Sequence, residues 1–445
     1  MELKEFVAAI DLGTSKIVGI IGTKDVTGSL TIHALEKEDA EGCIKRGCIQ
    51  NVDEAASKVK RLITKLENRA KTKIGKIYIG LGGQSVQSID HKVTRQLNED
   101  TPITDQIITS LKDVSMQMPL PGKEILEIVP SEYLVDGKKV VQPVGVYGSE
   151  IEATHKLIVG KQAIRKNLRR MEEKIQLEVA GYMLSPLAAN LVLSEPEKSL
   201  GCVLVDFGAA TTTVSVYKEG LLRHLAVLPL GGNTITRDIM SLQLLENVAE
   251  KLKIFYGNAS PEIDDTDNKV LKQQNDGGVD SPEIQLRTLH QVILCRSEEI
   301  VENILNQVKI SGYEKLIPAG FILTGGASNM KGLTALFRKK TDAEVKQGYF
   351  QRQIVSRNQP EIGKDASYSI LLGMLAKGSV NCRKEPIAEP EPEVIIEQPV
   401  TPVEPAERAT YKSDEQKTAA NKGRSFIRFI GDMFKEDSNE QKLSD

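Results

Sequence analysis

Residues 6–22 read FVAAIDLGTSKIVGIIG, and residues 201–217 read GCVLVDFGAATTTVSVY. In each segment an apolar strand leads into Asp-x-Gly and a run of small or hydroxyl residues, and a second apolar strand follows. This order predicts a β-hairpin with its tight turn at the Asp and Gly, where glycine tolerates positive φ. The repeat predicts an α/β chain of two similarly built halves, each opening with such a hairpin.

The two hairpins carry residue types that hold the phosphates of a nucleotide. Backbone N–H groups can bind phosphate oxygens, and carboxylates can hold hydrated Mg²⁺. The candidates are Asp11, Gly13, Thr14, Ser15 and Lys16 in the first hairpin, and Asp206, Gly208, Thr211 and Thr212 in the second. Residues 321–328 read FILTGGAS, a strand that delivers Gly325 and Gly326 to a turn where a flat base could lie close. Each piece alone is an ordinary turn, but together they predict an ATP site in a cleft.

Two segments with small residues are expected to join the halves. Residues 184–193 (LSPLAANLVL) and 367–376 (SYSILLGMLA) read as helices that carry Ala188, Ala189 and Gly373. Small residues would let the two helices cross closely at a hinge, although both can also be ordinary core helices. Other helices are predicted over 52–71 (behind Asn51 as a cap), 104–116, 161–177, 242–255 and 286–308.

Composition favours a soluble globular body. Apolar residues make up 40% and charged residues 27% of the chain, the formal net charge is −3, and no basic block suggests a nucleic-acid partner. The five cysteines form no CxxC pair, which fits a reduced cytosolic compartment better than disulfides or a zinc site. The N-terminus lacks the features of an export signal, and no stretch approaches the roughly 18 apolar residues of a spanning helix. Membrane contact is therefore expected to be peripheral.

The composition changes at Lys384. Six prolines and seven glutamates between Glu385 and Glu407 predict an extended, disordered linker over 384–421. Residues 422–436 then read KGRSFIRFIGDMFKE.

A helix over 422–438 would be amphipathic. Its apolar face would consist of Phe426, Ile427, Phe429, Ile430, Met433 and Phe434. Arg424, Arg428, Asp432 and Lys435 would occupy the opposite face. Basic residues beside a bulky apolar face predict a helix that lies on anionic membrane lipids. The alternative is docking on the protein's own core or on a partner, and the long linker argues against docking on the core.

Five motifs occur in the order typical of the actin, Hsp70 and hexokinase superfamily: phosphate 1, connect 1, phosphate 2, adenosine and connect 2. Within it, the chain resembles the FtsA family of bacterial cell-division actin homologues across residues 4–380. DLGTSK at 11–16, LPLGGNTITRDI at 228–239 and AEKLK at 249–253 look like that family. So does IVPSEYLVDG at 128–137, which lies where the family carries a subdomain of its own.

The resemblance implies further site residues. Glu250 and Lys253 match the residues that reach ribose and adenine, and Gly231, Gly232 and Asn233 match the turn below the nucleotide. Ala327 completes the adenosine motif with Gly325 and Gly326, and Asp11 and Asp206 would hold Mg²⁺ through water. Relatives usually have Gly-Gly-Thr where this chain has Ala209, Ala210 and Thr211. The added methyl groups put hydrolysis in question, and the sequence identifies no general base.

The resemblance also implies a domain plan. An actin-like two-domain fold, with duplicated ribonuclease H-like domains, would place domain 1 in residues 1–83, 161–195 and 366–383. Domain 2 would occupy 196–240 and 311–365. The FtsA-type inserted subdomain would span 84–160 and the domain 2 subdomain 241–310.

The implied function is that of a structural adaptor rather than an enzyme, with weak ATPase activity compatible with it. ATP would favour filaments of the protein at the cytoplasmic side of the cell membrane, at the division site. The filaments would anchor the tubulin-like protein FtsZ through its C-terminal peptide, bound at residues 241–310, and recruit other divisome proteins. A small-molecule kinase is the main alternative, but no motif provides its catalytic carboxylate. A pilus-assembly actin homologue does not account for the amphipathic tail, and an Hsp70-like chaperone would need a β-rich peptide domain.

Overall fold

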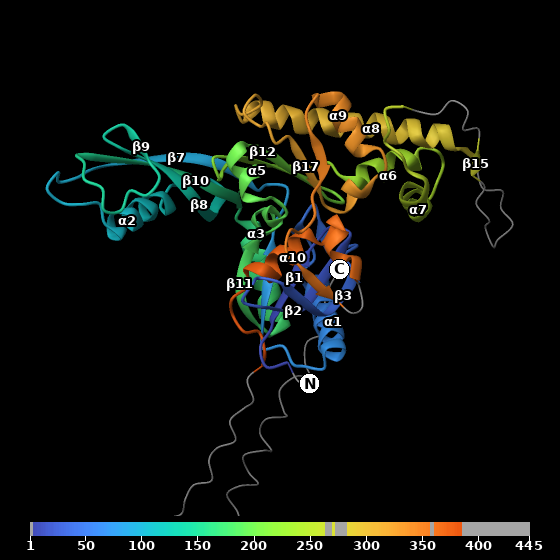
Figure 1. Cartoon of the computed structure of the whole chain (residues 1–445). Coiled ribbons are helices and arrows are strands. Elements are labelled where there is room, and N and C mark those ends of the chain that lie inside the picture. Colours follow the sequence, from blue (N-terminus) through green and yellow to red (C-terminus); the bar gives the residue numbers. More distant parts are fainter. Residues whose placement is uncertain (1–2, 263–268, 272–282, 357–359, 385–445) are drawn as a thin grey trace, which may run out of the picture. The chain divides into compact units, whose positions relative to one another are not determined.

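The structure of the chain is a computed structural model that describes residues 3–262, 269–271, 283–356 and 360–384 (Figure 1). All of these lie in one compact unit, Met1–Pro386. The predicted linker, apart from Lys384, and the predicted membrane helix over 422–438 lie outside the described residues. None of the helices in the described part combines the length and the apolar composition that a bilayer span requires.

The first half is built on a six-stranded sheet with the order β11-β6-β1-β2-β3-β19. Its strands are β1 (Val7–Leu12), β2 (Lys16–Lys24), β3 (Leu30–Asp39), β6 (Lys76–Leu81), β11 (Glu178–Leu184) and β19 (Ile354–Ser356). The helices that accompany it are α1 (Val52–Ala70), α3 (Ala163–Ile175), α4 (Ser185–Ala189) and α10 (Ser369–Lys377). β1 pairs antiparallel with β2 and parallel with β6, so Asp11 lies near the end of a central, buried strand.

The second half and the insertion share a nine-stranded sheet with the order β18-β17-β12-β13-β14-β7-β10-β8-β9. The strands of the second half are β12 (Cys202–Phe207), β13 (Thr212–Lys218), β14 (Leu221–Leu228), β17 (Phe321–Thr324) and β18 (Val345–Gln347). Those of the insertion are β7 (Gln87–Gln96), β8 (Lys123–Val135), β9 (Lys138–Val140) and β10 (Glu150–Lys161). The two groups join through β14 and β7, where Ala226 pairs with Gln87.

The remaining elements are short strands and helices around these two sheets. Two hairpins are formed by β4 (Ile44–Lys45) with β5 (Cys48–Ile49) and by β15 (Val270–Leu271) with β16 (Ile284–Gln285). The other α-helices are α2 (Asp105–Met116), α5 (Glu195–Leu200), α6 (Gly232–Met240), α7 (Glu246–Tyr256), α8 (Leu286–Ile310) and α9 (Leu333–Thr341). Short 3₁₀ turns span Asn190–Val192, Gly326–Asn329, Pro360–Lys364 and Ala366–Tyr368. Each half has its own apolar core, and the insertion has a third, smaller one.

Both Asp-x-Gly hairpins are confirmed, but glycine serves a different purpose than expected. Neither Gly13 nor Gly208 has a positive φ. A Cβ on Gly13 would instead lie 2.7 Å from the carbonyl oxygen of Lys16, and one on Gly208 would lie 2.9 Å from that of Thr211. The glycines are required because the two sides of each turn approach closely, not because the backbone is left-handed.

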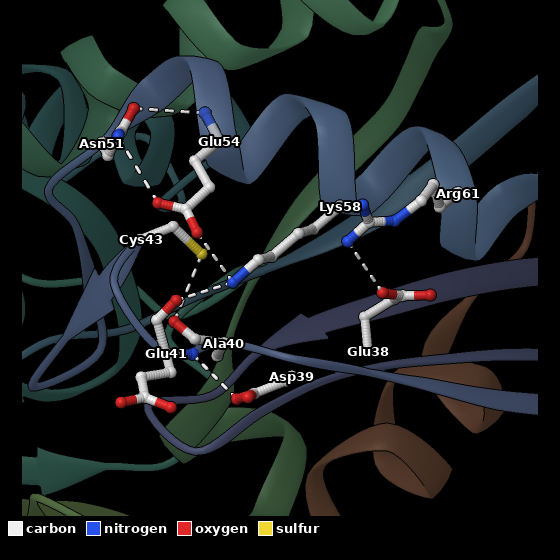
Figure 2. A network of polar contacts seen from close by, with 9 residues as sticks. All are labelled: Glu38, Asp39, Ala40, Glu41, Cys43, Asn51, Glu54, Lys58 and Arg61. Atoms are coloured by element: carbon white, nitrogen blue, oxygen red, sulfur yellow. Dashed lines mark hydrogen bonds and ion pairs between the residues drawn. The ribbon is translucent and has the colours of Figure 1, made fainter.

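Polar contacts fix the first turns of α1 to the loop after β3, as Figure 2 shows. The Asn51 side chain accepts a hydrogen bond from the Glu54 N–H (3.1 Å), so the predicted cap is confirmed. The Lys58 ammonium pairs with the Glu54 carboxylate (2.9 Å) and donates to the Glu41 carbonyl (2.6 Å). These contacts fix the loop after β3 against the start of α1.

Most predicted helices are shorter in the structure, and in two of them the backbone shows why. Residues 184–193 do not form one helix, because Leu184 still pairs with Leu81 as the last residue of β11. α4 then lasts only until Ala189, before the 3₁₀ turn. Residues 242–255 are helical only from Glu246, because Gln243 has a φ of 64° and interrupts the helical path. The preceding helix α6 was not predicted.

An ion-pair network ties the insertion to the second half. Arg223 on β14 pairs with Glu132 on β8 (2.9 Å) and with Glu219 (2.7 Å), and only 8% of its side chain is exposed. Lys139 on β9 binds the same two carboxylates. Next to this network, the Leu225 N–H donates to the Ser88 hydroxyl at 2.8 Å.

Replacing Arg223 with methionine should lower the free energy of unfolding by about 1–2 kcal/mol, because Glu132 would lose its more buried cation. Urea unfolding of the full chain measures this change. Lys92→Met is the control, since it breaks the Lys92–Glu152 pair, in which the lysine is 66% exposed. That loss should stay below about 0.5 kcal/mol. Equal losses in the two variants would contradict the role given to Arg223.

Candidate nucleotide site

A cavity of about 500 Å³ lies between the two Asp-x-Gly hairpins. Its walls include both hairpins, the start of α4, the α6–α7 pair, the turn after β17 and the residues before α10. All predicted nucleotide residues line it except Thr212 and Gly231. The separate predictions from the hairpins, the AEKLK helix and the FILTGGAS strand therefore meet in one place.

Thr212 and Gly231 support the cavity wall from behind. Thr212 is fully buried, and its hydroxyl donates to the Leu230 carbonyl at 2.8 Å. A Cβ on Gly231 would lie 2.7 Å from the carbonyl oxygens of both Gly208 and Ala209. Gly231 thus allows the turn before α6 to pack on the second hairpin. These two residues therefore lie behind the wall and are not placed to contact a ligand in the cavity.

The first hairpin is held by neighbouring turns. The Gly47 N–H donates to the Thr14 hydroxyl at 3.0 Å, which places the turn between β4 and β5 against the first hairpin. The Ser185 hydroxyl, at the start of α4, donates to the Asp11 carboxylate at 3.4 Å. A Cβ on Gly80 would lie 2.9 Å from Asp11 Oδ1, so glycine leaves room for this carboxylate.

The second hairpin is locked to α6 and to the turn after β17. The Gly232 N–H donates to the Gly208 carbonyl (3.0 Å), and the Asn233 N–H donates to the Ala209 carbonyl (2.7 Å). Gly325 has a φ of 86°, and a Cβ there would lie 2.4 Å from Asp206 Oδ1. The adenosine-type turn therefore packs directly against the predicted metal carboxylate, which only glycine permits.

Asp11 and Asp206 are two buried carboxylates that line the cavity. Burial raises the pKa of Asp11 to about 6, against the effects of the Ser185 hydrogen bond and Lys16. Burial and the charge of Asp11 raise the pKa of Asp206 to about 7. Two desolvated carboxylates that repel one another favour a cation between or beside them. These residues therefore fit Mg²⁺, which prefers a few carboxylate oxygens together with water and phosphate.

Lys16 provides positive charge at the same end of the cavity. Burial lowers the pKa of Lys16, and the neighbouring ammonium of Lys37 lowers it further. Both ammonium groups lie 4.9 Å from the ring centre of Tyr368. A phosphate anion near Lys16 would relieve the repulsion between the two lysines.

Another part of the cavity wall is formed by α6 and α7. The Lys253 ammonium donates to the Gly232 carbonyl (3.0 Å) and the Thr236 hydroxyl (2.7 Å), and pairs with Glu250 (2.6 Å). Burial lowers the pKa of Lys253, while Glu250 opposes that shift. Lys253 and Glu250 thus present fixed polar groups to a ligand in the cavity.

Several lining residues were missed by the reasoning from sequence. They are Gly47, Gly82, Gly83, Ser185, Asn329, Lys331, Ser367 and Tyr368, among others. The pair Gly82–Gly83 follows a strand just as Gly325–Gly326 does, so the same signal could have found it. Nothing in the local sequence marks the others, because long-range packing brings them to the cavity.

Comparisons with known proteins find matches in one family. The family model described as "Cell division protein FtsA" matches residues 203–373, and "SHS2 domain inserted in FTSA" matches residues 83–159. The FtsA of Porphyromonas gingivalis is 34% identical over 337 residues, covering 75% of this chain and 70% of that protein. The FtsA of Neisseria meningitidis serogroup B is 30% identical over 353 residues, covering 78% and 84%. The FtsA of Streptococcus pneumoniae serotype 2 is 28% identical over 464 residues, covering 98% and 100%.

A solved structure shares the fold at lower sequence identity. The "PilM-PilN type IV pilus biogenesis complex" superposes with a TM-score of 0.59 and 16% identity, covering 83% of this chain and 97% of the other. That match supports the fold alone, which is the expected actin-like two-domain α/β fold. Sequence identity of 28–34% to FtsA proteins, against 16% to this pilus protein, favours the first over the pilus-assembly alternative. By sequence identity, coverage and the inserted subdomain, the chain belongs to the FtsA family of actin-like bacterial cell-division proteins.

Proposed function

We propose that the chain binds MgATP in this cavity and acts as a nucleotide-dependent structural protein of the division machinery. The observation that carries the proposal is the position of Asp11 and Asp206. They come from duplicated hairpins in different halves, yet both line one cavity. A ligand that bridges them would couple the two halves.

The cavity residues divide into groups suited to the parts of a nucleotide. Backbone N–H groups around Gly13 to Ser15 and around Gly208 to Thr211 would hold phosphate oxygens, with Lys16 as counter-charge. Asp11 and Asp206 would bind Mg²⁺ through water, and the bound Mg²⁺ would neutralise phosphate charge. Glu250 and Lys253 would contact the ribose and adenine, with Gly325, Gly326 and Ala327 beside the base.

A structural role fits the cavity better than a kinase role. Among the described lining residues, the carboxylates are Asp11, Asp206 and Glu250. The first two are assigned to the metal, and Glu250 is paired with Lys253 at 2.6 Å. Within the described lining, that leaves no further carboxylate to activate a sugar hydroxyl. Phosphorylation of an added sugar by the purified chain would instead support the kinase.

Attachment to the membrane is assigned to the amphipathic tail. One tail should bind weakly, because ordering a short helix offsets much of the gain from burying its apolar face. Filaments of linked copies would bind far more tightly through their raised effective concentration. We infer that such filaments, on the cytoplasmic face of the cell membrane at the division site, bind the FtsZ C-terminal peptide at residues 241–310. They would then recruit other divisome proteins.

Replacing Phe426, Phe429 and Phe434 with glutamate should release the full chain from anionic vesicles. The three carboxylates would remove most of the apolar face and be repelled by the lipid charge. Co-sedimentation with vesicles, with and without MgATP, measures the effect, and more than tenfold loss of bound protein is expected. Unchanged sedimentation of this variant would rule out attachment through the tail.

A further inference from the structure

Three chain segments meet where the described part of the chain ends. Residues 3–6 precede β1, residues 71–76 join α1 to β6, and residues 381–384 follow α10. Figure 1 places the N-terminus at the end of the first half that lies away from β12 and β17.

Backbone hydrogen bonds hold these segments together. The Cys382 N–H donates to the Phe6 carbonyl, and the Gly75 N–H donates to the Cys382 carbonyl, both at 2.8 Å. The Lys384 N–H donates to the Lys73 carbonyl at 3.0 Å. Cys382 itself is fully buried beneath them. The three segments therefore form one ordered surface from which the tail departs.

The three segments are rich in basic residues. We call them the root cluster: Lys4, Lys71, Lys73, Lys76, Arg383 and Lys384. Two nearby acids are already engaged, since Glu67 pairs with Lys73 (2.7 Å) and Glu178 pairs with Lys76 (2.8 Å). Glu5 is the one acid within the three segments. The cluster is thus positive, although the whole chain has a formal net charge of −3.

The cluster is accessible. Lys4, Lys71 and Lys384 are exposed. The side chain of Lys73 is 72% exposed even though it pairs with Glu67. Ion pairs between exposed side chains are weak. The positive charges of these lysines are therefore available to an external anion.

The chain itself indicates which anion this is. Directly after Lys384 it continues into the tail whose far end is proposed to bind lipid, so the cluster is the part of the body tethered nearest to the membrane. Residues 385–407 contain seven glutamates and no lysine or arginine. An anionic bilayer would repel that segment and attract the cluster. The attraction acts within a Debye length of about 8 Å, so it operates once the body is drawn to the surface.

We propose that the root cluster is a second membrane contact, which binds anionic lipid headgroups without inserting into the bilayer. The contact would turn the tail-bearing end of the first half toward the membrane and fix the orientation of each copy in a filament. This inference rests on the proposed attachment through the tail.

Vesicle binding by the full chain tests the contact. The test variant neutralises three exposed lysines: Lys4→Gln, Lys71→Gln and Lys384→Gln. The control variant neutralises three exposed lysines of the second half: Lys251→Gln, Lys309→Gln and Lys315→Gln. On phosphatidylcholine vesicles with phosphatidylglycerol, the test variant should bind roughly tenfold more weakly at low salt, and the loss should shrink as salt is added. The control variant should bind within about twofold of the unmodified chain.

The outcomes separate this inference from the proposed function. If the Phe426, Phe429 and Phe434 variant stays bound, attachment through the tail fails. If that variant is released but the root-cluster variant binds like its control, only the root contact fails. Tighter binding by the root-cluster variant would show that the acidic segment 385–407 occupies the cluster, and would overturn the inference too.

A proximity measurement gives an independent readout. A fluorophore at position 71 should be quenched by lipids with a labelled headgroup, and one at position 315 should be quenched much less. Equal quenching at both positions would contradict the proposed orientation.

Discussion

Replacing Gly373 with alanine is expected to lower the free energy of unfolding by about 3 kcal/mol and to weaken nucleotide binding. A Cβ at this position would lie 2.0 Å from the carbonyl oxygen of Ala188, where α10 crosses α4. Alanine is the better helix former by about 1 kcal/mol, so propensity alone predicts the opposite sign. The overlap should dominate, because Ala188 and the neighbouring Met374 are buried and neither backbone can retreat freely.

Gly82→Ala is the matched control for the stability effect of Gly373→Ala alone, because Gly82 lines the cavity. An added methyl group there would lie 3.6 Å from the Ser185 hydroxyl, an ordinary contact distance. Urea unfolding of both variants should therefore give a loss below about 1 kcal/mol for Gly82→Ala. A stable Gly373→Ala variant that binds ATP normally would show that the close crossing of α4 and α10 is not required.

Replacing Asp206 with asparagine is expected to remove the Mg²⁺ dependence of ATP binding and to stabilise the nucleotide-free chain at pH 8. The loss of Mg²⁺ dependence follows from removing a proposed metal ligand. The stabilisation follows from the burial of this carboxylate beside Asp11, which raises the pKa of Asp206 to about 7. With its counter-ion absent, the ionised pair is unfavourable in the folded state. Asparagine keeps the shape and removes the charge, so the gain should be on the order of 1–3 kcal/mol.

The pH dependence fixes the sign of this second prediction. The pKa of Asp206 is raised from 3.8 to about 7 on folding, so between these values the folded state binds more protons than the unfolded state. Stability of the nucleotide-free chain should then fall as pH rises from 4 to 7, and the Asp206→Asn variant should lack part of this slope. MgATP binding should change in the opposite direction and weaken as pH falls from 8 to 6, because protonated carboxyls cannot bind the metal.

Thermal unfolding at several pH values, with and without MgATP, measures both effects. Glu246→Gln serves as the control, since Glu246 is an exposed residue at the start of α7. It should leave the pH dependence and the ATP response as they are. An Asp206→Asn variant that is less stable than the unmodified chain at pH 8 would contradict the account of a strained carboxylate pair.

Local sequence signals predicted the parts of the site that depend on short motifs. In the two hairpins, the helix behind Asn51 and the strand before Gly325, a pattern of apolar residues is followed or preceded within a few positions by a turn or cap residue. The fold class and the meeting of the motifs could be predicted because the repeat implies two equivalent halves. The family resemblance added Glu250 and Lys253, for which composition gave no signal.

Long-range packing determined what the sequence could not reveal. The end of β11 at Leu184 depends on its pairing with β6, and a helical pattern of apolar residues concealed it. The positions of Thr212 and Gly231 behind the wall depend on how α6 packs on the second hairpin. The joining of β14 to β7, which makes the insertion an extension of the second sheet, depends on contacts between residues far apart in the chain, such as the pair Ala226 and Gln87.

Titration calorimetry of the full chain with ATP tests the central claim most directly. In the proposed function, Asp11 and Asp206 bind one shared metal–nucleotide ligand. Saturable binding of one ATP per chain is therefore expected in Mg²⁺ buffer. Binding should be much weaker when the metal is chelated, and the Asp206→Asn variant should no longer respond to the metal. Absence of ATP binding in Mg²⁺ buffer, by a chain that is folded, would contradict the account.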